Sequence, residues 1–183
     1  MAAPIEFYFD FSSPYGYVGA NTIDAIAKKY GREVNWHPIL LGAVFQITGG
    51  TAPVNIPLKG DYFRHDFERT TRLFKVDYQF PSIFPITGLV PARAFYWIHK
   101  QNPALAKQFA LAAYRAYFVD DRDIQKSEVI LDVAAALGIN RDDLTAALGD
   151  TAVKDKLKAE VQSAIDKGVF GSPYFIVDNE SFF

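Results

Sequence analysis

The stretch that decides the fold stands near the start of the chain, where residues 5–15 read IEFYFDFSSPY. Residues 5–9 are β-branched and aromatic apart from one glutamate, a composition that predicts a buried strand. A turn follows, and Ser13 with Pro14 then forms a strong start signal for a helix, with the serine as N-cap and the proline as first helical residue. The segment therefore predicts a strand that delivers a serine to the N-terminus of a helix.

The elements that follow are predicted from the same kinds of signal. The first helix is expected to end at Gly31, before a second strand over residues 34–39 that Pro38 places at a sheet edge or ends. Residues 42–60 contain several glycines and prolines and are interpreted as a long ordered loop. Ser127 is expected to be an N-cap. Further helices are expected over residues 61–76, 92–100, 103–118, 127–137, 141–148 and 151–167.

The end of the chain returns to a strand pattern. Residues 168–177 read GVFGSPYFIV and are interpreted as a loop that enters a strand at Pro173, followed by a turn and the start of another strand. Strands at both ends with helices between them predict an α/β fold, a small mixed sheet with an inserted all-helical domain. We expect residues 1–41 and 150–183 to form the sheet domain and residues 42–149 to form the insertion.

Composition excludes several classes of function. The 183-residue chain has no cysteine, so disulfide chemistry, thiolate metal sites and a protein-borne redox couple are excluded. The formal charge of -2 provides no basic footprint for nucleic acid and no polybasic patch for a membrane surface. His37, His65 and His99 show no metal-ligand spacing. A serine hydrolase that uses Ser13 would need a Gly-x-Ser-x-Gly elbow, which is missing.

Targeting signals are also not found. The N-terminus lacks a charged start followed by a long apolar run, and no stretch of the chain reaches the ~18 apolar residues that a membrane-spanning helix needs. The expectation is a cytoplasmic protein without a signal peptide or membrane span.

Two terminal motifs together carry a resemblance to a known family. Residues 7–15, taken with residues 168–175, resemble the glutathione-dependent isomerases of 2-hydroxychromene-2-carboxylate, which are relatives of the kappa-class glutathione transferases and the DsbA-type oxidoreductases. Residues 53–62, PVNIPLKGDY, resemble the loop before this family's first inserted helix. The resemblance implies a thioredoxin-like sheet with a helical domain inserted after the second strand. It also implies a homodimer, with a glutathione site between the two parts.

The resemblance assigns roles to particular residues. The family's catalytic serine, which also binds glutathione, falls on Ser13, where a redox relative would carry its reactive cysteine. The cofactor-binding residue before the family's cis-proline falls on Ser172, and the cis-proline itself on Pro173. Residues that line the pocket for the aromatic substrate fall on or near Phe45, Asn55, Ile56 and Phe84.

These residue types suit thiolate chemistry. A helix N-terminus carries about half a positive charge and unpaired N–H groups, so it should stabilise the thiolate of bound glutathione, and the Ser13 hydroxyl can donate to that sulfur. Such a charge-assisted bond contributes about 1.5–3 kcal/mol, or one to two decades in thiolate population. The thiolate would add to a conjugated double bond of an aromatic carboxylate, allow it to rotate or reopen, and leave unchanged. Lys59 would steady the substrate's carboxylate, and Asn55 would bond an oxygen.

Other interpretations of these residues stay open. Asn55 fits a loop residue that bonds its own backbone, Lys59 a solvated charge at a helix start, and Phe45 and Phe84 core positions. A kappa-like glutathione transferase or peroxidase, or a non-catalytic thioredoxin-like binding module, would fit the same pattern. The family's turn that grips the γ-glutamyl end of glutathione would lie beyond Phe183, so a truncated C-terminal end is expected.

Overall fold

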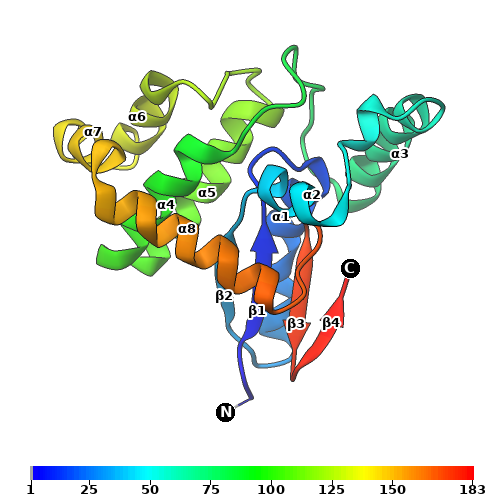
Figure 1. The fold of residues 1–183 in the computed structure, drawn as a ribbon, viewed down its shortest axis with the longest axis horizontal. Coiled ribbons are helices and arrows are strands. Elements are labelled where there is room, and N and C mark those ends of the chain that lie inside the picture. The colour runs from blue at the N-terminus through cyan, green and yellow to red at the C-terminus, as the bar shows by residue number, and fades with distance from the viewer. Residues whose placement is uncertain (1) are drawn as a thin grey trace.

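A four-stranded sheet forms the centre of the protein in the computed structural model, which describes residues 2–183 (Figure 1). The strand order is β2-β1-β3-β4. β1 runs parallel to β2 and antiparallel to β3, and β4 runs antiparallel to β3, so the predicted mixed sheet is confirmed. Pro38 ends β2, which is an edge strand as expected. The strands are β1 (Ile5–Phe9), β2 (Val34–Pro38), β3 (Tyr174–Val177) and β4 (Glu180–Phe182).

The helices lie between β2 and β3 in the chain, apart from the first. α4 to α7 gather on one side of the molecule, α3 stands on the other, and α8 leads back to the sheet (Figure 1). None of the helices formed by residues 2–183 is long and apolar enough to cross a membrane. The helices are α1 (Pro14–Lys29), α2 (Leu41–Thr48), α3 (Lys59–Phe74), α4 (Leu89–Gln101), α5 (Pro103–Phe118), α6 (Ser127–Ala135), α7 (Arg141–Gly149) and α8 (Thr151–Asp166), with a short 3₁₀ helix η1 (Pro53–Asn55).

The prediction of a long loop over residues 42–60 is wrong, because α2 and η1 lie in this segment. α2 has no side-chain cap from its own neighbours. Its first N–H, that of Leu41, instead donates to the carboxylate of Asp10 at 2.6 Å. Gly49 ends the helix in the left-handed region, with φ of 70°. The start signal for α2 therefore lies 31 residues away in sequence, where a local pattern does not show it.

Three helix starts also differ from expectation. Ser127 is the first residue of α6 and not its N-cap, since Lys126 holds the cap position without a side-chain bond. α3 begins at Lys59, two residues before the predicted start. α4 begins at Leu89, so that Pro91 lies in its first turn, where a missing N–H leaves no intrahelical bond unmade.

A buried aromatic core joins the sheet to the helical part. The Phe9 ring lies 6.0 Å from that of Phe95 on α4 and 5.9 Å from that of Tyr114 on α5. Phe11 continues the contact, with its ring 5.2 Å from that of Tyr114. Aromatic pairs at such distances add to the large apolar area they bury. This core fixes the turn after β1 against α5, while the boundary between a sheet domain and a helical domain stays a prediction.

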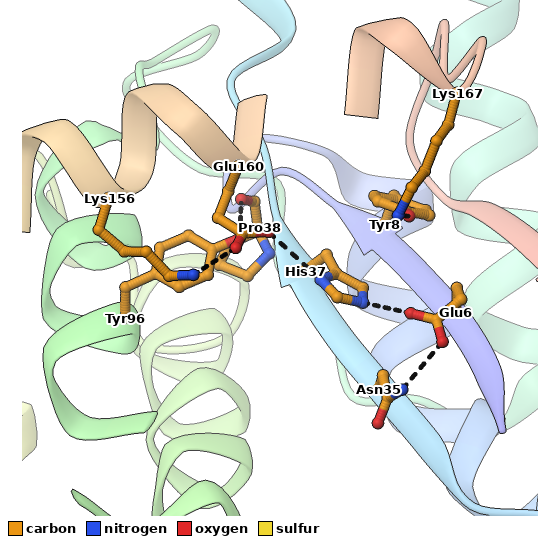
Figure 2. A network of polar contacts seen from close by, with 9 residues as sticks. All are labelled: Glu6, Tyr8, Asn35, His37, Pro38, Tyr96, Lys156, Glu160 and Lys167. Atoms are coloured by element: carbon orange, nitrogen blue, oxygen red, sulfur yellow. Dashed lines mark hydrogen bonds and ion pairs between the residues drawn. The ribbon is translucent and has the colours of Figure 1, made fainter. Parts of the chain in front are cut away.

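A polar network fastens α8 to the sheet (Figure 2). His37 on β2 lies between two carboxylates, with Nε2 bonded to Glu6 on β1 and Nδ1 3.7 Å from Glu160 on α8. The Tyr8 ring stacks on His37 at 4.8 Å, and Lys167 donates from the end of α8 to the Tyr8 hydroxyl at 3.2 Å. Because α8 leads directly into the loop before β3, this network also helps to hold that loop in place.

The carboxyl of Glu160 makes the contribution of this network to folding stability depend on pH. His37, together with Lys156, lowers the pKa of Glu160 to about 2. Because the pKa of Glu160 is lower in the folded protein than its ordinary value of 4.5, the ionised carboxylate stabilises the fold above about pH 4.5. This contribution is lost as the pH falls toward 2. We expect Glu160→Gln to remove about 1–2 kcal/mol of this pH dependence, a figure reduced for solvent screening. Urea unfolding at a series of pH values measures it.

A matched control for this prediction is Glu33→Gln. Glu33 is exposed in the turn before β2, and its side chain makes no ion pair among residues 2–183. This variant should keep the pH dependence of the wild type. If Glu160→Gln and the wild type lose stability in parallel between about pH 5 and pH 2, the pKa of Glu160 is not lowered by the network.

Candidate functional site

Ser13 stands at the N-terminus of α1, where the sequence placed it. Its backbone is extended, its hydroxyl oxygen accepts from the N–H of Gly16 at 3.0 Å, and Pro14 is the first helical residue. The preceding turn is closed by the Ser13 N–H, which donates to the carbonyl oxygen of Asp10 at 2.9 Å. The side chain is only 5% exposed. The predicted N-cap is therefore confirmed, and the hydroxyl is fixed at the positive end of the helix.

Ser172 faces Ser13 from the other end of the chain. The Ser13 hydroxyl donates to the Ser172 carbonyl oxygen at 2.9 Å, and the Ser172 hydroxyl accepts from the Asp10 N–H at 2.9 Å. The peptide bond between Ser172 and Pro173 is cis, as the resemblance implied. Gly16 allows this close approach, because a Cβ there would lie 2.7 Å from the Ser172 hydroxyl oxygen. Two segments that are 159 residues apart in sequence thus meet at one point.

Asp10 is the residue of this site that the sequence analysis missed. Its side chain is 2% exposed, and its two carboxylate oxygens accept from the N–H groups of Ser12 at 2.8 Å and Leu41 at 2.6 Å. Its carbonyl oxygen accepts from the Tyr114 hydroxyl at 2.8 Å. Burial raises the pKa of the Asp10 carboxyl, while the two N–H groups oppose this rise by holding the charged form. An aspartate two residues before a turn N–H is an Asx-turn signal, which would have identified it.

A cavity of about 560 Å³ opens beside these residues. Ser13 and Ser172 line it together with Phe45 on α2 and Phe84, so four of the predicted site residues share one cavity. Most of the lining is apolar. It comes from the start of α1, from α2, from the segment around η1, from α3, and from the loops that hold residues 84–87 and 170–172.

Three of the predicted substrate residues do not line the cavity. Asn55 and Lys59 are exposed, and Ile56 is half-buried. Their neighbours Ala52 and Pro53 line it instead. Pro173 is half-buried beside Ser172 and is also outside the lining. The substrate roles of Asn55, Ile56 and Lys59 stay predictions, and the geometry supports them less than the roles of Phe45 and Phe84.

Two residues close to Ser13, Tyr15 in the same helix turn and Ser172 across the site, carry further backbone donors. The N–H groups of Tyr15 and Ser172 have no acceptor within the part of the chain that the structure describes, residues 2–183. Both residues line the cavity. Free N–H groups at a helix N-terminus and on an adjacent extended loop form a site for an anion or for a peptide backbone. The residues present therefore fit the thiolate and the peptide backbone of glutathione. No group of three potential metal ligands occurs among residues 2–183.

Comparison with known proteins finds relatives over nearly the whole chain. A protein of Sphingobium xenophagum named 2-hydroxychromene-2-carboxylate isomerase is 25% identical over 184 residues, which cover 100% of this chain and 92% of that protein. Glutathione S-transferase kappa 1 of Rattus norvegicus is 24% identical over 177 residues, covering 92% of this chain and 78% of that protein. A solved structure of 2-hydroxychromene-2-carboxylate isomerase covers 98% of this chain and 87% of its own, with a TM-score of 0.88 and 23% identity.

The family itself is shown by a match to the DSBA-like thioredoxin domain over residues 4–183. By name, the two relatives above are an isomerase and a transferase, which is the group of enzymes that the resemblance indicated. The match extends over nearly the whole chain, and the fold agrees with that of the solved isomerase. The chain therefore belongs to the DSBA-like thioredoxin domain family, and the thioredoxin-like fold predicted from its sequence is confirmed.

Proposed function

We propose that this protein is a glutathione-dependent isomerase of conjugated aromatic carbonyl compounds. The observation that carries the proposal is the position of the Ser13 hydroxyl, at a helix N-terminus and in a cavity also lined by Tyr15 and Ser172, whose N–H groups have no acceptor among residues 2–183. The names of the relatives, an isomerase and a glutathione transferase, support it. When bound, glutathione supplies a thiolate that adds reversibly to a conjugated double bond, so that the bond can rotate before glutathione leaves unchanged.

The protein's own groups act by binding and orientation. The Ser13 hydroxyl and the Tyr15 N–H stabilise negative charge at the sulfur position, and the dipole of α1 adds to this effect. The backbone of Ser172 pairs with the peptide part of the cofactor. The aromatic side chains of Phe45 and Phe84 hold the substrate's ring and keep water away from the reacting atoms.

Turnover with glutathione tests this proposal. A cis-configured aromatic α,β-unsaturated ketone and 2-hydroxychromene-2-carboxylate, the compound named for the relatives, are incubated with the protein and followed by chromatography. We expect isomerisation of at least one of the two compounds, which requires glutathione and leaves its concentration unchanged. If glutathione is consumed in step with product, the protein is a kappa-like transferase, for which the apolar cavity is also suited.

A second measurement separates an enzyme from a binding module. Titration with glutathione is followed by the ultraviolet absorbance of its thiolate. A bound thiolate without turnover of any conjugated carbonyl compound would indicate a non-catalytic module, and the absence of a bound thiolate would contradict the proposal. A homodimer and a cytoplasmic location stay predictions.

A further inference from the structure

The cavity that Ser13 and Ser172 line also has a group of apolar lining side chains, and we call the part that they form the apolar half. It is formed by Leu41, Ala43, Phe45, Pro53, Phe63 and Phe84. The Phe63 and Phe84 rings lie 6.1 Å apart and nearly parallel, and the Tyr15 ring meets Phe63 edge-on at 5.7 Å. These rings form an aromatic wall that suits a planar conjugated ligand. Thr51 and Thr87 are polar residues that also line the cavity, and both are exposed.

No lysine, arginine or histidine is found among the residues that line the cavity. Its one acid is Asp10, whose carboxylate is taken up by the N–H groups of Ser12 and Leu41. Two of the basic side chains of α3 are engaged elsewhere. The guanidinium of Arg64 lies over the Phe80 ring at 3.7 Å, and Arg69 pairs with Asp66. Lys59, the residue that the sequence suggested for a substrate carboxylate, is exposed and outside the lining.

A carboxylate in the apolar half would therefore lose its hydration without gaining a partner, which is unfavourable for any buried charge. It would also add a third negative charge beside the thiolate of bound glutathione and the carboxylate of Asp10. Resting on the proposed function, we infer that the substrate of this protein is a neutral aromatic α,β-unsaturated ketone or aldehyde, and not a carboxylated compound such as the one named for its relatives. The inference concerns the binding of the substrate and leaves the reaction type unchanged.

Two ligands of matched shape test this inference. Benzylideneacetone and benzylidenepyruvate share a phenyl ring, a double bond and a ketone, and they differ by a methyl group in place of a carboxylate. Their affinities are measured by calorimetry, with the protein alone and with S-methylglutathione, which lacks a free thiol. We expect benzylideneacetone to bind at least tenfold more tightly in both cases. Equal affinities, tighter binding of benzylidenepyruvate, or no binding of benzylideneacetone would overturn the inference.

Two variants sharpen the measurement. Thr87→Lys places a cation at an exposed position of the cavity lining and should improve the binding of benzylidenepyruvate about two- to fivefold, with little change for benzylideneacetone. Lys59→Ala should change neither affinity, because this side chain lies outside the lining. A selective loss of benzylidenepyruvate binding in Lys59→Ala would overturn the inference. The glutathione titration stays separate, since the ligand pair can be compared without glutathione and therefore distinguishes failure of the inference from failure of the proposed function.

Discussion

Replacing Ser13 with alanine should lower the thiolate population of bound glutathione about tenfold at neutral pH. The hydroxyl now donates to the Ser172 carbonyl oxygen, so a thiolate would take over a donor that already has a partner. A bond to a charged acceptor is about twice as strong as one to a neutral acceptor. The thiolate therefore gains only the difference between the two bonds. For a charge-assisted bond of roughly 1.5–3 kcal/mol, this difference corresponds to about one decade in the thiolate population. Ultraviolet absorbance of the thiolate during a glutathione titration measures the change.

The same substitution also removes the N-cap of α1, which costs about 1 kcal/mol of stability. Asn102→Ala is a control for this effect, because it removes a comparable bond, to the N–H of Leu105, at the start of α5. Ser12→Ala is a control for a hydroxyl that lines the same cavity without a bond to Ser172. Both controls should keep the thiolate population of the wild type. An unchanged thiolate population in Ser13→Ala would contradict the proposed role.

Asp10→Asn should destabilise the fold by about 2–4 kcal/mol. The carboxylate presents one oxygen to the Ser12 N–H and the other to the Leu41 N–H. An asparagine offers one oxygen, so its amide group must face one of these two donors and leave it without an acceptor. Gly88 lies against the same carboxylate, since a Cβ there would be 2.6 Å from it, and a shift of the side chain has little room.

Urea unfolding measures this loss, and hydrogen exchange of residues 41–48 reports whether α2 is released first. Asp61→Asn is the matched control, because Asp61 is an exposed acid in the first turn of α3 and its replacement should change stability by less than about 0.5 kcal/mol. A similarly small change for Asp10→Asn would show that the carboxylate does not tie α2 to the turn after β1. Faster exchange confined to α2 would agree with the prediction.

Helix starts could be predicted from the sequence where the residues that form the cap are neighbours in the chain. Ser13 and Pro14 carry their cap signal within three residues, so the start of α1 was predicted correctly. The cis bond before Pro173 was implied by the resemblance and is present. α2 was missed because its anchor is the carboxylate of Asp10, which lies in another segment. Ser127 was predicted to be a cap because serine is a preferred N-cap residue. The prediction was wrong because α6 begins one residue earlier and makes no side-chain cap bond.

The candidate site shows the same division. The sequence alone was sufficient for a mixed sheet, a serine at a helix N-terminus, and a second serine before a proline ahead of a strand, since each follows from neighbouring residues. The tertiary structure was needed to show that Ser13 donates to Ser172, that Asp10 joins the turn before α1 to the start of α2, and that Lys59 stays outside a cavity whose lining has no basic side chain. These facts depend on which segments meet in space. Such meetings are decided by packing of the shared core, and no local periodicity encodes them.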